Sequence, residues 1–439
     1  MPSFDRRRLL QSLALSALGA GIPGCERSRY DLDYLEDTPD FTHQRAPHYF
    51  VFYFLMGGWD ITTLTEPRVK GARMSPSYKP GAIFEYGGHR LGPAMQPLVR
   101  HMDQMAVLRG LRATALNHPQ ARFQLVTGKF REPRQAPAAS IQTRLADLIG
   151  RDYPIPNLSA DGLRPATFLG DYDPHLEPFR IGEMYALRGL SRPRGPMIDQ
   201  EDVVFEALRK RDAAYVAKHA ESAMAENFAA SAELARQAAE SDYRWRASEF
   251  VAPRFKETAN LEHKNRWGYQ VHLVVEAIRN DIAPIITAGS GEFDAHNEHD
   301  YGYHQRAITR SMEAVAAICD GLAEHRTADG GTLLDRTTVV ISSEFSRQPW
   351  INELGGKHHW DANAALFLGK GVRGTKGGLT MVGECDEQLF PQPLNPVTGK
   401  PDRGADDVTN GHFLATVLAM AGIDPGPHFD QSPIQGLIA

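Results

Sequence analysis

The chain has 439 residues, of which 42% are hydrophobic and 23% are charged, and its formal net charge at pH 7 is −6. This length suffices for one large domain or two ordinary ones, with a substantial buried core. The mild negative charge, without a dense run of lysine or arginine after the first residues, argues against a basic nucleic-acid-binding surface. We therefore expect no nucleic acid among the partners.

Residues 1–25, MPSFDRRRLLQSLALSALGAGIPGC, are typical of an export signal rather than of a folded element. Three arginines precede an apolar run that is too short to span a bilayer. The paired arginines resemble a twin-arginine signal, which predicts export of a folded protein. The sequence IPGC resembles a lipoprotein cleavage box, so Cys25 is the candidate lipidated residue, and an ordinary cleaved signal is the alternative.

Residues 26–47 are polar and charged without a sustained apolar period, as expected of a tether between a domain and a membrane surface. Signal and tether together predict a cell-envelope protein on the periplasmic side of a membrane. Its membrane contact would be the lipid on Cys25. The folded domain is expected over residues 48–439.

The first predicted strand is the apolar and aromatic run HYFVFYFLM, residues 48–56, which ends at two glycines. Asp60 follows directly. A second short strand, residues 106–108, leads through RGLRATALNHPQ to a helix near residues 121–127, with Pro119 suited to a first turn. This pattern predicts one strand-loop-helix unit.

Two further strands are predicted at residues 283–289 and 337–343, and another at AALFLG, residues 364–369. Between the first two, apolar residues recur at spacings of four and three, which predicts an amphipathic helix. A strand, a crossover helix and a strand imply parallel pairing. The expected fold class is therefore α/β with a central, mostly parallel sheet.

Residues 199–250 are rich in alanine, glutamate, arginine and lysine and contain no glycine or proline. This composition predicts one or two long helices. They could form an inserted helical hairpin or cap, or a helical layer on the sheet.

An acid follows three of the predicted strands: Asp60, Asp294 and Glu344. The carboxyl ends of parallel strands meet at one edge of a sheet, which is where ligands bind in α/β proteins. Carboxylates that converge there must be protonated or must share cations. With histidines nearby, zinc, manganese or iron suits the site better than calcium.

Four segments, FLMGGWD, GEFDAH, SSEFSRQPWIN and GGKHHWD, resemble in order the motifs of a family of exported sulfatase-like bacterial proteins of unknown function. The family lies within the alkaline phosphatase superfamily. The resemblance runs from about residue 49 to the closing GHFLATVLAMAGID. It implies an alkaline-phosphatase-like three-layer α/β sandwich, and cleavage of phosphate or sulfate esters at one or two metal ions.

The resemblance also implies metal ligands. Asp60 matches the superfamily's first-strand aspartate, and Asp294 and His296 match its later aspartate and histidine. The superfamily separates that later pair by four residues, whereas this chain has Asp-x-His. Either His296 or His299 could therefore serve.

Glu344 stands where the superfamily places an aspartate after a strand. Phe345 replaces the histidine that commonly follows that aspartate. His358 or His359, in a glycine-flanked loop, could supply the replacement ligand.

The superfamily's nucleophile is a serine, threonine or modified cysteine at the start of the helix after the second strand. Here that turn holds His118 and Pro119, which leaves Thr114 as the nearest hydroxyl. A metal-bound hydroxide could attack instead, with His118 as base or ligand. The alternative for His118 is a helix-cap residue facing solvent.

Two arginines are candidate anion-binding residues. Arg122 is a candidate to bind the ester oxygens, and Arg347 is a candidate clamp because guanidinium binds tetrahedral oxyanions through two parallel hydrogen bonds. A salt bridge is the alternative for Arg347.

These patterns predict an exported hydrolase of phosphate or sulfate esters that depends on a divalent metal, zinc or manganese rather than calcium. Its substrate would be an ester-bearing small molecule or polymer. The alternative is a non-catalytic envelope lipoprotein that retains the fold to bind a polymer or a protein partner.

Overall fold

The structure is a computed structural model, and it describes residues 48–69, 74, 78–130, 138–160, 168–181, 198–218, 266–291, 293–297 and 301–439. The chain divides into two compact units, one of Met1–Asp40 with Ile181–Ala247 and one of Phe41–Arg180 with Ser248–Ala439. The predicted signal, the tether and Cys25 lie outside the described residues, as does His299.

The second unit is built on an eight-stranded sheet in the order β12-β4-β11-β8-β1-β7-β5-β6. The strands are β1 (Tyr49–Leu55), β4 (Met105–Arg112), β5 (Asn157–Ala160), β6 (Phe179–Ile181), β7 (Ile285–Ser290), β8 (Thr337–Ser342), β11 (Ala362–Gly369) and β12 (Thr380–Val382). Strand β11 pairs antiparallel with β4 and β8, whereas β1 is parallel to β7 and β8, β5 to β7, and β12 to β4. The expected α/β fold with a mostly parallel sheet is confirmed.

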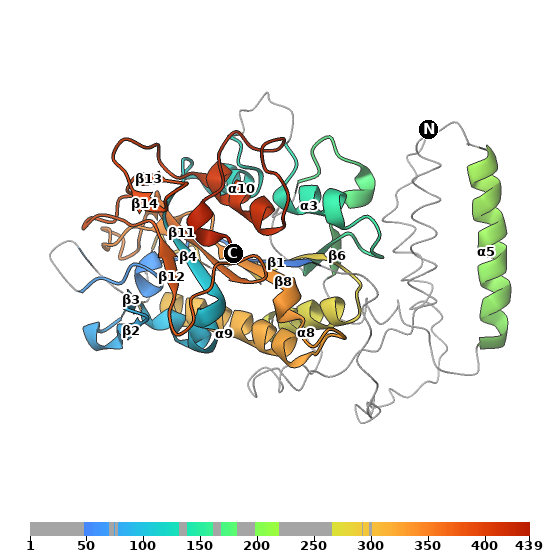
Figure 1. Cartoon of the computed structure of the whole chain (residues 1–439), viewed down its shortest axis with the longest axis horizontal. Helices are drawn as coiled ribbons and strands as arrows, with labels where there is room; N and C mark the ends of the chain where they lie inside the picture. The colour runs from blue at the N-terminus through green and yellow to red at the C-terminus, as the bar shows by residue number, and fades with distance from the viewer. Residues whose placement is uncertain are drawn as a thin grey trace. The chain divides into compact units, whose positions relative to one another are not determined.

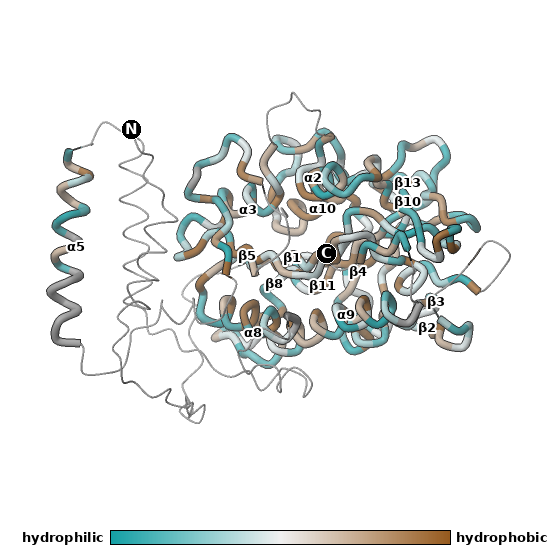
Figure 2. Tube along the Cα trace, turned by 180° about the vertical axis from the view of Figure 1, so that it is seen from behind, coloured by the Kyte–Doolittle hydropathy of each residue, from teal (hydrophilic) through white to brown (hydrophobic). Residues whose placement is uncertain are grey.

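Helices cover both faces of this sheet (Figure 1). Figure 2 shows the same layers from behind, with α2, α3 and α10 on one side of the strands and α8 and α9 on the other. The helices are α2 (His118–Thr127), α3 (Ile141–Ile149), α8 (Arg266–Arg279), α9 (Tyr301–Glu324) and α10 (Asn410–Met420), and the 3₁₀ segment η3 (Pro93–Gln104) packs on α9.

The sequence of strand β1 is apolar and aromatic without interruption because all seven of its residues are buried. Successive side chains of a strand point to opposite faces, so a strand covered on both faces is apolar at every position. Phe50, Phe52 and Phe54 join the core cluster that contains Phe413 of α10. The helix predicted from the spacing of apolar residues is α9. The residues that form its apolar stripe are all buried: Ile308, Met312, Val315, Cys319 and Leu322.

Shorter elements complete the described chain. They are η1 (Ile61–Thr63), η2 (Pro80–Ala82), β2 (Phe84–Tyr86), β3 (His89–Leu91), η4 (Pro174–Leu176), η5 (Leu334–Arg336), β9 (Ser346–Arg347), β10 (His359–Trp360), β13 (Leu394–Asn395), β14 (Lys400–Pro401) and η6 (Gln435–Leu437). In the first unit, α5 (Ile198–Lys218) is the described part of the segment expected to be a helical insertion. None of the described helices is long and apolar enough to cross a membrane.

The sheet brings several loops to one edge. Because β11 is antiparallel to both β4 and β8, strands β1, β4, β7 and β8 all run in one direction, and β11 begins where they end. The loops after these four strands and the segment before β11 therefore meet. Ligands bind at this edge in open α/β sheets.

Candidate metal centre

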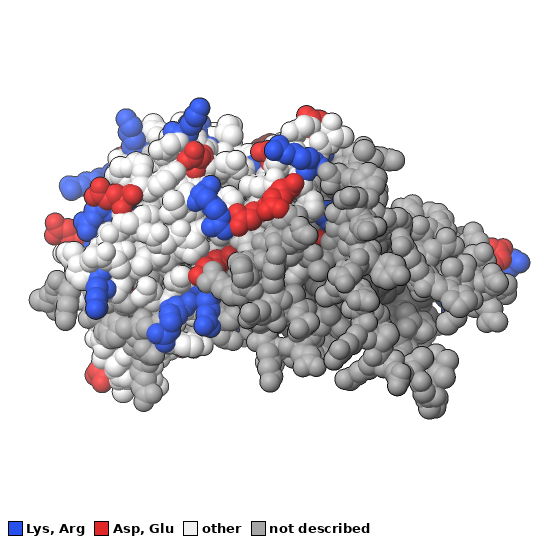
Figure 3. Space-filling view, turned by 90° about the horizontal axis from the view of Figure 1, so that it is seen from below, with Lys and Arg blue, Asp and Glu red and all other residues white. Residues whose placement is uncertain are grey.

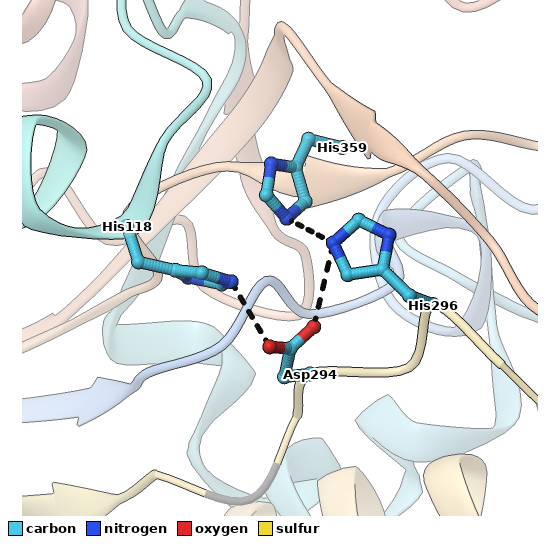
Figure 4. A group of neighbouring side chains, drawn as sticks. All are labelled: His118, Asp294, His296 and His359. Atoms are coloured by element: carbon cyan, nitrogen blue, oxygen red, sulfur yellow. Dashed lines mark hydrogen bonds and ion pairs between the residues drawn. The ribbon is translucent and has the colours of Figure 1, made fainter.

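Four side chains point toward one another at this edge: His118, Asp294, His296 and His359 (Figure 4). Each offers one ligand atom, and these atoms all lie within 4.8 Å of one another. His118 begins α2, Asp294 and His296 lie in the segment after β7, and His359 begins β10. Three imidazoles and one carboxylate within this distance could hold a metal ion.

Local sequence explains why His118 starts its helix. The side chain of Asn117 accepts a hydrogen bond from the backbone N–H of Gln120, which caps the helix, and Pro119 occupies the first turn. Proline is favoured there because its missing N–H would have no partner in the helix. His118 is thereby held at the end of α2 that lies at the sheet edge.

Two glycines let the loops of the site approach each other. A Cβ at Gly57, where φ is +116°, would lie 2.6 Å from the backbone nitrogen of Asp294. A Cβ at Gly356 would overlap the carbonyl of His296, next to the hydrogen bond of 2.8 Å from the Lys357 N–H to the Ala295 carbonyl. Only residues without a side chain fit at these two contacts.

Hydrogen bonds donated by their Nδ1 atoms orient two of the imidazoles. His118 Nδ1 lies 2.9 Å from Oε1 of Glu344, and His359 Nδ1 bonds to the carbonyl of Leu116. A carbonyl or an ionised carboxylate only accepts hydrogen bonds, so Nδ1 carries the proton in both rings. Each Nε2 therefore presents a lone pair to the group of four, as in metal-bound histidines that are held by an outer carboxylate or carbonyl.

The Nε2 atom of His118 is buried and makes no hydrogen bond within the described part of the chain, although Oδ2 of Asp294 lies 3.3 Å away. The Nε2 atoms of His296 and His359 are 2.7 Å apart. Buried polar atoms without partners are rare in proteins, and an ion is one explanation for them. With Asp294 beside it, this nitrogen is placed as a ligand atom of a group that could hold a cation.

Burial favours the neutral form of His296 and of His359, which is the form that binds metal. Burial lowers the pKa of His359 to about 4, although its bond to the Leu116 carbonyl acts in the opposite direction. Burial and the charge of Arg347 also lower the pKa of His296, against the effect of Asp294.

Asp294 has a side chain that is 52% exposed, so the group of four is open to solvent on its side. Burial alone would raise the pKa of Asp294, but the hydrogen bond and the charge of Arg347 lower it below the ordinary value. The Arg347 guanidinium lies 2.7 Å from Oδ1 of Asp294. The carboxylate is therefore ionised at neutral pH.

Arg347 is fully buried, and its other hydrogen bonds go to the carbonyls of Gly57, Gly58 and Lys357. The salt bridge considered as the alternative to an anion clamp is thus the contact that the structure shows. Arg347 fixes Asp294 against the glycine turn after β1.

Glu344 lies outside the group of four, although it was expected among the ligands. Its buried carboxylate accepts hydrogen bonds from the Gly57 N–H, the Ser343 hydroxyl, His118 and Nε of Arg122. Burial raises the pKa of Glu344, but the His118 hydrogen bond and the Arg122 charge outweigh it and lower the pKa overall. Arg122, expected to bind the ester, contacts this carboxylate at 3.2 Å.

Asp60 also lies outside the group. Both it and Lys357 are fully buried, with Nζ 2.6 Å from Oδ2 of Asp60, and the Thr62 hydroxyl and N–H bond to Oδ1. The sequence does not predict Lys357 at the site, because a lysine in a glycine-rich loop is usually exposed to solvent.

Of the two remaining candidates, His358 lies near the group of four and Thr114 lies outside it. His358 has Nδ1 3.4 Å from Nδ1 of His296, and its side chain is 47% exposed. Thr114 is exposed and accepts a hydrogen bond from Gln124, so the structure does not bring its hydroxyl into the group of four.

The fold and the site define an α/β protein with a candidate metal centre at the carboxyl edge of its sheet. The chain belongs to a family of proteins of unknown function (DUF1501), whose model matches residues 57–431. Comparison with curated proteins finds no match.

Solved structures similar to the chain include sulfatases and a synthase, at low identity. Ps i-CgsB has a TM-score of 0.40 at 10% identity, over 88% of this chain and 75% of that one. A putative sulfatase from Bacteroides thetaiotaomicron VPI-5482 has a TM-score of 0.40 at 10% identity, over 86% and 71%. The lipoteichoic acid synthase LtaP from Listeria monocytogenes has a TM-score of 0.37 at 8% identity, over 98% and 82%.

Proposed function

We propose that this protein is an exported, metal-dependent hydrolase of phosphate or sulfate esters. The observation that carries this is the group of His118, Asp294, His296 and His359, whose ligand atoms all lie within 4.8 Å of one another. The motifs that resemble sulfatase-like members of the alkaline phosphatase superfamily support the reaction class.

The donor set favours one transition-metal ion. Three imidazole nitrogens and one carboxylate oxygen suit zinc or manganese, whereas calcium prefers six to eight oxygen ligands. The buried ammonium of Lys357 already balances the charge of Asp60, so Asp60 is not needed as a ligand. We propose a single ion held by the group of four.

A divalent ion at such a site polarises an ester oxygen and lowers the pKa of a bound water toward neutrality. The protein's own residues hold the ligands in place: Glu344 orients His118, the Leu116 carbonyl orients His359, and Arg347 fixes Asp294. Because Asp294 is half-exposed, an ester group can reach the site from solvent. The group of four contains no hydroxyl, so water is the proposed nucleophile.

The proposal is tested by measuring turnover of 4-nitrophenyl phosphate, bis(4-nitrophenyl) phosphate and 4-nitrophenyl sulfate. Protein stripped with chelator would be compared with protein reloaded with zinc or manganese. Turnover that requires the ion and is lost in His296→Ala supports the hydrolase. Full metal occupancy without turnover of any ester would favour the second candidate, a non-catalytic binding protein, which the lack of a hydroxyl in the group also favours.

Export is proposed from the sequence of the first 25 residues. Replacing Arg6 and Arg7 together by lysine should retain the protein in the cytoplasm if the twin-arginine route carries it. Cys25→Ala should release the exported protein from the membrane fraction if Cys25 is lipidated. Unchanged fractionation of both variants would remove this part of the proposal.

A further inference from the structure

A cavity of about 280 Å³ lies elsewhere in the second unit, and none of the four metal-centre residues lines it. The segment after η1, the β2–β3 hairpin and strands β4 and β12 form its walls. The lining residues that matter here are Glu66, Arg68, His89, Arg90 and Arg109. We refer to it as the arginine cavity.

Positive groups outnumber negative ones in its lining. The carboxylate of Glu66 is 3% exposed, with Oε2 3.1 Å from Nη1 of Arg68 and Oε1 3.6 Å from Nη1 of Arg109. The lining thus holds one carboxylate and three guanidinium groups. The third, Arg90, is exposed, and its cross-strand neighbour in the hairpin is the exposed Glu85. The cavity therefore has unbalanced positive charge.

Arg109 also has an unused donor. Its Nε is buried and has no hydrogen-bond partner within the described residues, although the side chain is 24% exposed. A guanidinium carries five N–H donors in a planar fork that matches oxyanions. A buried donor without a partner costs free energy, so the contacts of this guanidinium within the protein are incomplete.

A β-bulge sets the position of Arg109. Strand β4 pairs Arg109 with Ala364 and Leu111 with Asn363, so Gly110 between them has no partner on β11. Gly110 has a φ of +67°, and a Cβ there would lie 2.6 Å from the Glu384 carbonyl. Bulges re-aim side chains and are common beside functional sites.

We propose that the arginine cavity binds a tetrahedral oxyanion, a sulfate or phosphate group, through Arg109 and Arg90. Arg68 contributes its positive charge, since its Nη1 and Nη2 atoms already donate to the carbonyls of Pro67 and Asp386. The group could be a free ion or one charged group of a polyanionic chain, since the same guanidinium chemistry recognises both. This inference does not depend on the metal centre, because the cavity shares no lining residue with it.

Glu66 competes with the anion for the same guanidinium groups. Burial raises the pKa of Glu66, although Arg109 and Arg68 act against that shift. Glutamine has nearly the same shape as glutamate but carries no charge. Removing its charge should strengthen anion binding, while removing an arginine should weaken it. A merely structural ion pair would not produce these opposite effects.

The test is calorimetric titration of chelator-treated protein with inorganic sulfate, inorganic phosphate and a sulfated oligosaccharide at constant ionic strength. Arg109→Gln should weaken binding about tenfold or more, Arg90→Gln by less, and Glu66→Gln should strengthen it severalfold. Arg403→Gln, an exposed arginine outside the cavity, is the control and should change nothing. Because Arg90 is exposed, its variant stays informative if Arg109→Gln unfolds.

Tighter binding of the oligosaccharide, lost in the same variants, would identify a group carried by a chain, whereas equal binding would identify the free ion. No binding of any of the three probes would overturn the inference. Binding that survives Arg90→Gln and Arg109→Gln in folded protein, or that weakens in Glu66→Gln, would also overturn it.

Discussion

The ammonium of Lys357 lies 2.6 Å from the carboxylate of Asp60, and both side chains are fully buried. Asp60 follows β1 at the sheet edge, the position from which a metal ligand was expected. The Lys357 ammonium, a cation of the protein itself, therefore balances the negative charge of Asp60. Breaking such a pair on one side leaves an uncompensated buried charge, whereas replacing both members can be neutral.

Replacing the lysine alone should therefore destabilise the fold. We expect Lys357→Met to lower the free energy of unfolding by about 3 to 5 kcal/mol. Adding Asp60→Asn to that variant should restore much of the loss, as measured by urea unfolding. Lys400→Met, at an exposed lysine, is the control. If Lys357→Met were as stable as the parent protein, the buried ion pair would not form.

Asp60 should not contribute to metal binding. Asp60→Asn should leave the metal content unchanged, because the side chain bonds to Lys357 and Thr62 rather than to the group of four. Elemental analysis of the folded variant checks this. Loss of the ion would instead support the role that the motif resemblance implies for Asp60.

Glu344 should act on the metal through His118. Glu344→Gln should weaken metal affinity about 10- to 100-fold, because the carboxylate that accepts from Nδ1 fixes the ring and its tautomer. Competition with a chromogenic chelator measures the affinity. Glu353→Gln is the matched control, since that side chain is 79% exposed. Equal losses in the two variants would point to a general effect of charge.

His272 should make the fold sensitive to acid. Burial lowers its pKa to about 4, and neither ring nitrogen has a hydrogen-bond partner among the described residues. The unfolded chain binds this proton near pH 6.5 and the folded chain only near pH 4, so stability is complete above pH 6.5 and falls between these values. The loss amounts to about 3 kcal/mol.

Urea unfolding of His272→Leu across this pH range checks the assignment. The variant should lose much of the fall in stability between pH 6.5 and pH 4. His428→Gln is the control, because its imidazole is only partly buried and should contribute much less. Parallel pH profiles for the parent and His272→Leu would contradict the assignment.

The elements with the strongest patterns were predictable from the sequence. The uninterrupted apolar run of β1 and the apolar stripe of α9 reflect burial, which acts directly on residue choice. Parallel pairing followed from the strand-helix-strand order and placed the loops after β1, β7 and β8 at one edge. In the structure, Asp294 and His296 lie in the segment after β7, at this edge.

The contacts within the edge were not predictable, because they depend on side chains from loops far apart in the sequence. Asp60, Asp294 and Glu344 are alike in sequence position, yet Lys357 pairs with the first, Arg347 with the second, and Arg122 and His118 with the third. Only Asp294 joins the group of four. No periodic pattern encodes which cation meets which acid.

The most direct test of the metal centre is elemental analysis of the purified protein, beside His296→Ala, His359→Ala and His358→Ala. We expect about one equivalent of zinc or manganese in the parent and in His358→Ala, whose half-exposed imidazole is outside the group, and little in the other two variants. A parent that retains no divalent ion after loading with zinc or manganese, or variants that keep it undiminished, would contradict the proposed centre.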